Sequence, residues 1–191
     1  MLKDLILASR SYRSFDPSVK IDRNSLLDWV DCARLSPSSI NLQMLKFRLV
    51  TDSAECNSML KGTRWAGKIK DQRLPPDGHA PAAYIVICAD NRVIATAEKF
   101  QKDVGICAQS IMLAAAEAGF GGCMIGSFSP DEVASMLALP DSVVPQLVLA
   151  LGKPDECVRI TDAAEDGSVT YYRENGIHYV QKRALKDLIL K

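Results

Sequence analysis

Apolar residues recur at helical spacing in five parts of the sequence. The clearest case lies between Asp22, which can cap a helix N-terminus, and Pro37, which stops a helix. A second strong signal is Ser129-Pro130-Asp131-Glu132, a capping box with proline at the first helical position. We predict helices over residues 2–9, 22–37, 53–62, 99–118 and 129–137.

Shorter apolar runs between these helices predict strands. Residues 47–51 alternate with period two, whereas residues 82–89 are continuously apolar with a β-rich centre, Tyr84-Ile85-Val86-Ile87. A continuous apolar run is typical of a strand that is buried on both faces. We predict further buried strands over 122–126 and 146–151.

The remaining segments complete a single α+β domain over residues 1–191, with the central helix packed on the sheet. Residues 63–81 are rich in Gly, Pro and charge, and such long connections are often binding loops or lids. The tail alternates through Val169, Tyr171 and Tyr179, and we predict that it ends as a basic helix, Lys182 to Leu190.

One stretch, Val104 to Phe128, contains a single charged residue, Glu117, and is long enough to be tested as a membrane span. Three glycines at 119, 121 and 122 interrupt it, and glycine clusters end helices. We interpret the stretch as a buried helix followed by a buried strand. The helix over 99–118 is apolar nearly all round, which indicates a central position and a buried dimer interface.

Charge and composition exclude several classes of partner. The formal net charge is zero and 48% of residues are hydrophobic, as in ordinary soluble proteins. There is no basic excess to hold nucleic acid or an anionic membrane, although a local patch could bind one phosphate. The six cysteines include no Cys-x-x-Cys and the start of the chain resembles no signal peptide, so we expect a reducing, cytoplasmic setting. The two histidines have no acidic neighbours at ligand spacing, so we expect no metal.

Three segments could carry a ligand. Arg10-Ser11-Tyr12-Arg13 offers two guanidiniums that could hold a phosphate, although on its own the segment is better explained as a solvated charged turn. The loop Ser38-Ser39-Ile40-Asn41-Leu42-Gln43 could read a polar ring, or could satisfy its own backbone after a helix end. Gly126-Ser127 follows a strand, where short side chains would let a flat ligand approach the backbone.

Taken together and in this order, five motifs resemble the nitroreductase family. Arg10 to Phe15 is similar to its Arg-Ser-x-Arg-x-Phe signature, and Ala33 to Gln43 to its Ala-x-x-x-Pro-Ser-x-x-Asn-x-Gln element. Asp103 to Gly121 resembles its core helix, Leu149 to Pro154 its last central strand, and Tyr179 to Arg183 its basic C-terminal motif. Ser9 stands where many members have another arginine, so phosphate binding would depend more on the C-terminal pair Lys182 and Arg183.

The resemblance implies an α+β nitroreductase-like fold with a central, mostly antiparallel sheet flanked by helices, and an interlocked homodimer that binds FMN. By matching position, Arg10, Ser11, Tyr12 and Arg13 would bind the FMN phosphate and ribityl chain, helped by Lys182 and Arg183. Ser38, Ser39 and Asn41 would come from the partner chain, with Gln43 near the ring. The backbone of Gly126 and Ser127 would face the reactive edge of the ring.

The resemblance also implies the reaction, because the chemistry belongs to the flavin and requires no catalytic side chain. NAD(P)H would give a hydride, and a nitroaromatic, quinone or related small acceptor would take the electrons. The chain has no separate dinucleotide fingerprint, which favours one pocket and a ping-pong mechanism. Two alternatives stay open: a module that stores or senses FMN without turnover, and an enzyme of flavin or cofactor breakdown.

Overall fold

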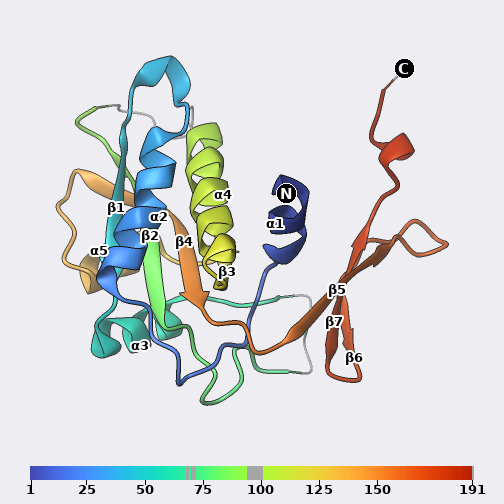
Figure 1. Cartoon of the computed structure of the whole chain (residues 1–191). Coiled ribbons are helices and arrows are strands. Elements are labelled where there is room, and N and C mark those ends of the chain that lie inside the picture. The colour runs from blue at the N-terminus through green and yellow to red at the C-terminus, as the bar shows by residue number, and fades with distance from the viewer. Residues whose placement is uncertain (68, 70–71, 94–100, 191) are drawn as a thin grey trace.

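A four-stranded antiparallel sheet forms the centre of the computed structural model, which describes residues 1–67, 69, 72–93 and 101–190 (Figure 1). The strand order is β1-β2-β4-β3, and the strands span Leu45–Val50 (β1), Ala83–Asp90 (β2), Gly121–Ile125 (β3) and Val143–Gly152 (β4). All eight residues of β2 are buried, as the continuous apolar run predicts. The four strands predicted from the sequence are confirmed within a few residues at each end.

Helices cover both faces of this sheet. On one face, α2 (Arg23–Leu35) and α4 (Gln101–Glu117) bury Trp29, Ile111 and other apolar residues against Ile85 and Leu149. On the other face, α3 (Ser53–Gly62) and α5 (Pro130–Met136) close a second apolar cluster around Val86. This three-layer arrangement is an α+β fold, as expected.

Local capping explains where three of these helices begin. The Asp22 carboxylate accepts from the backbone N–H groups of Asn24 and Ser25, and the Ser129 side chain accepts from the N–H of Glu132. Asp52 caps α3 in the same way. Each cap satisfies N–H groups that have no partner within the helix.

The sequence predicted that α4 is apolar on nearly all sides and buried, and within one chain the structure buries one of its faces. One face is buried, but Gly105, Ile106 and Gln109 on the opposite face are exposed, with Ile106 at 39%. Residues 99 and 100, where we predicted the helix to start, lie outside the described residues. Small residues on this face make the helix look uniformly apolar in sequence, although in one chain it has a covered and an uncovered side.

A peripheral layer lies beside α4, on the right in Figure 1. It contains α1 (Leu2–Ala8) and a small sheet of order β5-β7-β6, with strands Cys157–Asp162 (β5), Tyr172–Glu174 (β6) and Ile177–Lys182 (β7). No residue of α1 is buried. We did not predict β5, which pairs in parallel with β7.

The predicted C-terminal helix from Lys182 to Leu190 is wrong. Lys182 ends β7, and only a short 3₁₀ turn, Leu185–Asp187, follows it. Leu185, Leu188 and Ile189 are all largely exposed. A short amphipathic segment needs a surface to bury its apolar face before a helix becomes stable, and this chain alone supplies none there.

In the part of the chain that the structure describes, no helix has both the length and the apolar character needed to cross a bilayer. The stretch from Val104 to Phe128 is divided between α4 and β3, as the three glycines predicted.

Candidate functional site

A cavity of about 230 Å³ opens between α1, α4, β3 and the end of β7; we call it the α1–β3 cavity. Its polar lining joins two distant parts of the sequence, Arg10 and Ser11 after α1 and Lys182 at the end of β7. Met124 and Gly122 of β3 form its floor, together with residues of α4. Two cations and hydroxyl groups around a small cavity suit a phosphate or a similar anion.

Glycines on β3 allow the turn after α1 to lie against the sheet. The backbone N–H of Tyr12 donates to the Gly122 carbonyl at 2.9 Å, and Ser11 forms an isolated bridge with Gly122. A Cβ at Gly121 would lie 2.5 Å from the Tyr12 ring, and one at Gly122 would lie 2.2 Å from the Ala150 carbonyl oxygen. Larger residues would therefore push Arg10 and Ser11 away from β3.

Arg10 and Arg13, in the turn that lies against β3, each have a buried Nε donor without a hydrogen-bond acceptor among the described residues. Arg10 donates through Nη2 to the Ile6 carbonyl, but its Nε is buried without a partner, and so is the Nε of Arg13. Buried polar atoms in native proteins nearly always have a partner, so among the described residues these two donors are unusual and adjoin residues that line the two cavities.

A second cavity, of about 300 Å³, continues past the end of β3; we call it the β3-end cavity. It is lined by Cys123 to Ser127 together with Arg13, Tyr171 and the segment from Arg64 to Gly67. Met124 lines both cavities, so they follow one another along β3. A ligand with an anionic end in the first cavity would place its other end near Gly126 and Ser127. No Cβ contact would occur within 4 Å at Gly126, so the space beside its backbone is open.

Arg13 is held at the edge of the β3-end cavity by a buried network. Its Nη1 donates to the Ser11 carbonyl at 3.2 Å and lies 3.3 Å from Nε2 of His178, while its guanidinium sits 5.3 Å from the Tyr171 ring centre. The Glu156 carboxylate accepts from the backbone N–H of Arg13 and from Arg173. Burial and the two nearby guanidiniums lower the pKa of His178 to about 4, so the ring is neutral at pH 7.

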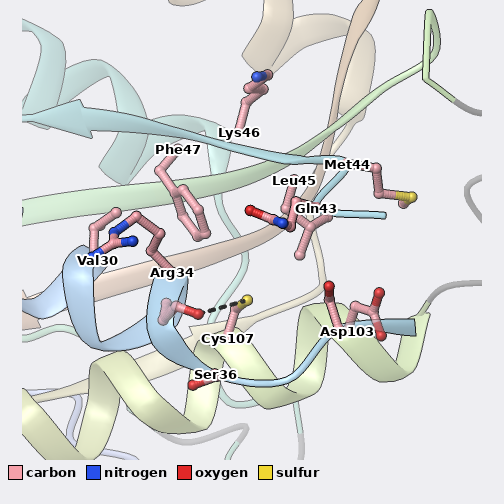
Figure 2. Close-up of a pocket in the computed structure, with 12 residues that line it drawn as sticks. Val30, Arg34, Ser36, Gln43, Met44, Leu45, Lys46, Phe47, Asp103 and Cys107 are labelled. Atoms are coloured by element: carbon pink, nitrogen blue, oxygen red, sulfur yellow. Dashed lines mark hydrogen bonds between the residues drawn. The ribbon is translucent and has the colours of Figure 1, made fainter. Parts of the chain in front are cut away.

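The loop from Ser38 to Gln43 lies elsewhere in the same chain, in a cavity of about 300 Å³ between α2, β1 and α4 (Figure 2). Gln43 and Ser38 line it, and the amide of Gln43 donates to the Asn41 side chain at 3.0 Å. Ser39 donates from its backbone and its hydroxyl to the buried Asp103 carboxylate, the hydroxyl at 2.7 Å. The loop is left-handed at Ile40, Asn41 and Gln43, and Ile40 is 87% exposed.

The structure thus brings some predicted site residues together and separates others. Arg10, Ser11 and Lys182 share the first cavity, whereas Arg13, Gly126 and Ser127 share the second. Tyr12 packs on Gly121 and Arg183 is exposed; neither lines these two cavities. Ser38, Ser39, Asn41 and Gln43 do not reach either cavity within one chain.

Several lining residues had no signal in the sequence analysis. Met124 of β3 and Tyr171, which directly precedes β6, line the β3-end cavity, and His178 of β7 lies behind it in contact with Arg13. Arg64 and Trp65 lie in the connection over 63–81, which we predicted only as a possible binding loop. Residues 68, 70 and 71 of that connection lie outside the described residues.

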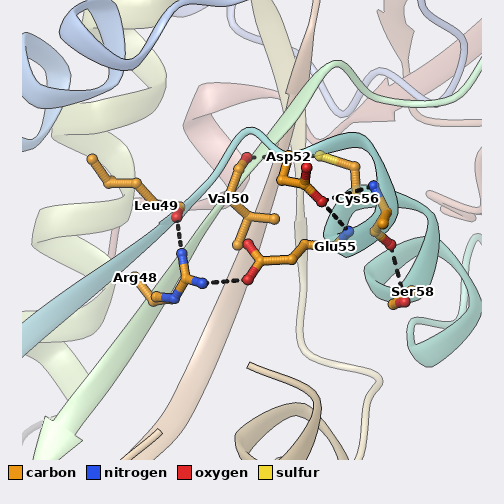
Figure 3. A network of polar contacts seen from close by, with 8 residues as sticks. Arg48, Leu49, Val50, Asp52, Glu55, Cys56 and Ser58 are labelled. Atoms are coloured by element: carbon orange, nitrogen blue, oxygen red, sulfur yellow. Dashed lines mark hydrogen bonds and ion pairs between the residues drawn. The ribbon is translucent and has the colours of Figure 1, made fainter. Parts of the chain in front are cut away.

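A polar cluster on the other side of the sheet has a structural role instead (Figure 3). Arg48 of β1 forms an ion pair with Glu55 of α3 at 2.5 Å, which ties the helix to the sheet edge. Burial raises the pKa of the nearby Cys56 thiol to about 11, so it is not a thiolate nucleophile at neutral pH. Among the described residues, no group of histidine, cysteine or carboxylate side chains has the arrangement of a metal site.

Comparison with known proteins identifies relatives of this chain. The model of the nitroreductase family matches residues 6–153. An NADPH-flavin oxidoreductase from Vibrio harveyi is 29% identical over 167 residues, which are 80% of this chain and 65% of that protein. The chain therefore spans slightly less than two thirds of this relative's length.

Solved structures of low sequence identity share the fold. A nitroreductase family protein from Streptococcus pneumoniae TIGR4 superposes with a TM-score of 0.71 at 17% identity, covering 91% of this chain and all of that chain. An FMN-dependent nitroreductase from Clostridium difficile R20291 gives a TM-score of 0.63 at 23% identity, covering 80% and 87%. Because the family model matches most of the sequence and the fold agrees, the chain belongs to the nitroreductase family.

Proposed function

We propose that this protein is an FMN-dependent oxidoreductase that takes a hydride from NAD(P)H and passes electrons to a small acceptor. The observation that carries the proposal is the pair of adjoining cavities along β3, cationic at one end and open beside Gly126 at the other. The similarity to the NADPH-flavin oxidoreductase supports it. When bound, FMN would supply the hydride and electron transfer, and the protein would supply binding and orientation.

The chain's own residues fit the three parts of FMN. Arg10, Ser11 and Lys182 would hold the phosphate in the α1–β3 cavity, with Arg183 adding positive charge nearby. The orphaned Nε atoms of Arg10 and Arg13 are donors of the kind that phosphate, ribityl and ring oxygens accept from. Arg13 would meet the ring in the β3-end cavity, and the backbone of Gly126 and Ser127 would bound its reactive edge.

We propose that a second copy of this chain completes the site. The loop with Ser38, Ser39, Asn41 and Gln43 does not reach the two cavities of its own chain, but a two-fold partner could bring it there. Exposed apolar residues on α1 and on the tail, including Leu2 and Leu185, favour a homodimer that covers them. We also propose that residues 1–191 form one domain and that donor and acceptor use the same pocket in turn.

A titration with FMN and riboflavin tests the phosphate site. We expect FMN to bind at least about tenfold more tightly than riboflavin, because a charge-assisted hydrogen bond contributes roughly 1.5–3 kcal/mol. The variants Arg10→Ala and Lys182→Ala should weaken FMN binding and leave riboflavin binding nearly unchanged. Lys186→Gln, an exposed lysine on the 3₁₀ turn after β7, is the matched control and should bind both as the parent does. Equal affinity of the parent protein for FMN and riboflavin would exclude this phosphate site.

A further inference from the structure

The β3-end cavity has two cationic and two aromatic side chains in its lining. Arg13 and Arg64 supply the charge, and Trp65 and Tyr171 the rings. None of the described residues that line it is acidic. An anion entering this cavity therefore meets the positive charge of two arginines, and the Glu156 carboxylate contacts the backbone N–H of Arg13 without being one of the described lining residues.

The segment that carries Arg64 and Trp65 is fixed to the end of β3. The backbone N–H of Arg64 donates to the Ser127 carbonyl at 2.9 Å, and Thr63 forms a bridge with Phe128. These contacts hold Arg64 beside the residues that we place at the reactive edge of the flavin.

The Trp65 ring is oriented by contacts below it. Its indole N–H donates to the Thr63 hydroxyl at 3.1 Å, and that buried hydroxyl donates to the Met59 carbonyl of α3 at 2.8 Å. Trp65 also packs against the apolar cluster beneath α3 and α5, while part of it lines the cavity. A ring held in this way offers an apolar wall for a flat ligand.

The two arginines have different surroundings. Arg13 is only 9% exposed and its guanidinium contacts the Ser11 carbonyl, His178 and Tyr171. Arg64 is exposed and reaches the cavity from the other side of Ser127. Arg13 is therefore built into the protein as part of the proposed ring site, and Arg64 is the cation placed to meet a second ligand.

We propose that the electron acceptor is an aromatic compound with a carboxylate, whose ring packs on Trp65 and whose carboxylate pairs with Arg64. The proposal rests on the proposed function and names the substrate class of that same site. With a nitroaromatic probe, the nitro group would take a hydride equivalent from NAD(P)H and one proton from water. The hydride equivalent and the proton leave with one nitro oxygen as water, so the products are the nitroso compound, NAD(P)⁺, this water and the hydroxide left by the proton donor; two electrons are transferred and all atoms balance.

Two probes of nearly equal shape isolate the charge: 4-nitrobenzoate and neutral 4-nitrobenzamide. We expect kcat/KM for 4-nitrobenzoate to exceed that for 4-nitrobenzamide by about tenfold, the size of one charge-assisted contact. Arg64→Gln should remove most of this preference by slowing 4-nitrobenzoate alone, and Arg64→Lys should retain part of it. Arg73→Gln is the control, because Arg73 is 81% exposed, pairs with Asp77 and lines a different cavity.

A binding experiment separates this inference from the proposed function. Calorimetric titration of the FMN-loaded protein with unreactive benzoate should give tighter binding than benzamide, and Arg64→Gln should abolish the difference. Reduction of both nitro probes at equal rates, or equal binding of benzoate and benzamide, overturns the inference and leaves the proposed function standing. The inference would also be overturned if Arg64→Gln weakened FMN binding and lowered kcat/KM equally for both probes. Arg64 would then hold the cofactor. If neither nitro probe is reduced and neither nicotinamide reduces the bound FMN, the proposed function fails, and benzoate binding still decides whether the cavity selects anions.

Discussion

At the scale of single residues, His178 shows how the site keeps its charge on arginine. His178 is 2% exposed, its ring centre lies 5.4 Å from that of Tyr171 with the two rings tilted by 54°, and its Nε2 faces the Arg13 guanidinium. Protonating the ring would place a third positive charge beside Arg13 and Arg173, although Glu156 forms an ion pair with Arg173. The neutral ring can instead accept from Arg13 and fix its direction.

This environment predicts a loss of stability in acid. The pKa of His178 is about 4 in the folded protein, below its ordinary value of 6.5, so the unfolded chain binds a proton first as the pH falls. The free energy of unfolding should be unaffected by this group above pH 6.5 and should then decrease, by at most about 3 kcal/mol by pH 4. Urea unfolding of the parent and of His178→Gln between pH 8 and 4.5 measures the effect as a difference. If the difference in the free energy of unfolding between the two proteins stays constant across that range, the lowered pKa of His178 is contradicted.

Single residues also show how far the site could be foreseen. Arg10 and Arg13 stand out in the sequence, but on its own the segment was better explained as a solvated turn; the structure adds Lys182 and Gly122 beside Arg10. Nothing in the sequence marks His178, because its role depends on two arginines brought to it from separate segments. The family resemblance provided the site residues that spacing alone could not.

At the scale of elements, local signals were reliable and distant pairings were not. The caps Asp22 and Ser129 begin α2 and α5 as predicted, because capping depends only on neighbouring residues. Strand β5 was missed although Val158 and Ile160 alternate with polar residues, because the run is short and mostly exposed and its parallel partner β7 lies 20 residues further along. The helix predicted after Lys182 failed because its apolar face has no cover within the chain.

The contact between α4 and the loop after α2 gives a prediction at this scale. Asp103 lies in the first turn of α4, where a carboxylate also suits the helix dipole, and its buried carboxylate accepts from the backbone N–H and from the hydroxyl of Ser39. Asp103→Asn should lower the free energy of unfolding by about 1.5–3 kcal/mol, because charge-assisted bonds are lost in a buried site. Asp131→Asn, at an exposed acid in the first turn of α5, should cost no more than about 0.5 kcal/mol. Urea unfolding measures both variants. If the free energy of unfolding decreases by a similar amount in each, Asp103 contributes no more than a favourable interaction with the helix dipole.

At the scale of the whole molecule, the separation between the Asn41 loop and the Arg13 site predicts that each site needs two chains. Suppose that Arg13→Ala and Asn41→Ala each disable their own homodimer. In a mixed dimer one site carries both changes and the other carries neither, so about half of the parent activity should return. Co-expression with two different tags isolates the mixed species for assay. Activity no higher than the mean of the two mutant homodimers would mean that each site lies within one chain.

The most direct test of the central claim is the visible absorbance spectrum of the purified protein without oxygen, before and after addition of NADH or NADPH. The account predicts one bound FMN per chain, bleached within seconds by at least one of the two nicotinamides and restored by an electron acceptor. A protein that takes up no FMN would contradict it. So would bound FMN that dithionite reduces but neither nicotinamide does, the behaviour of a module that stores or senses flavin.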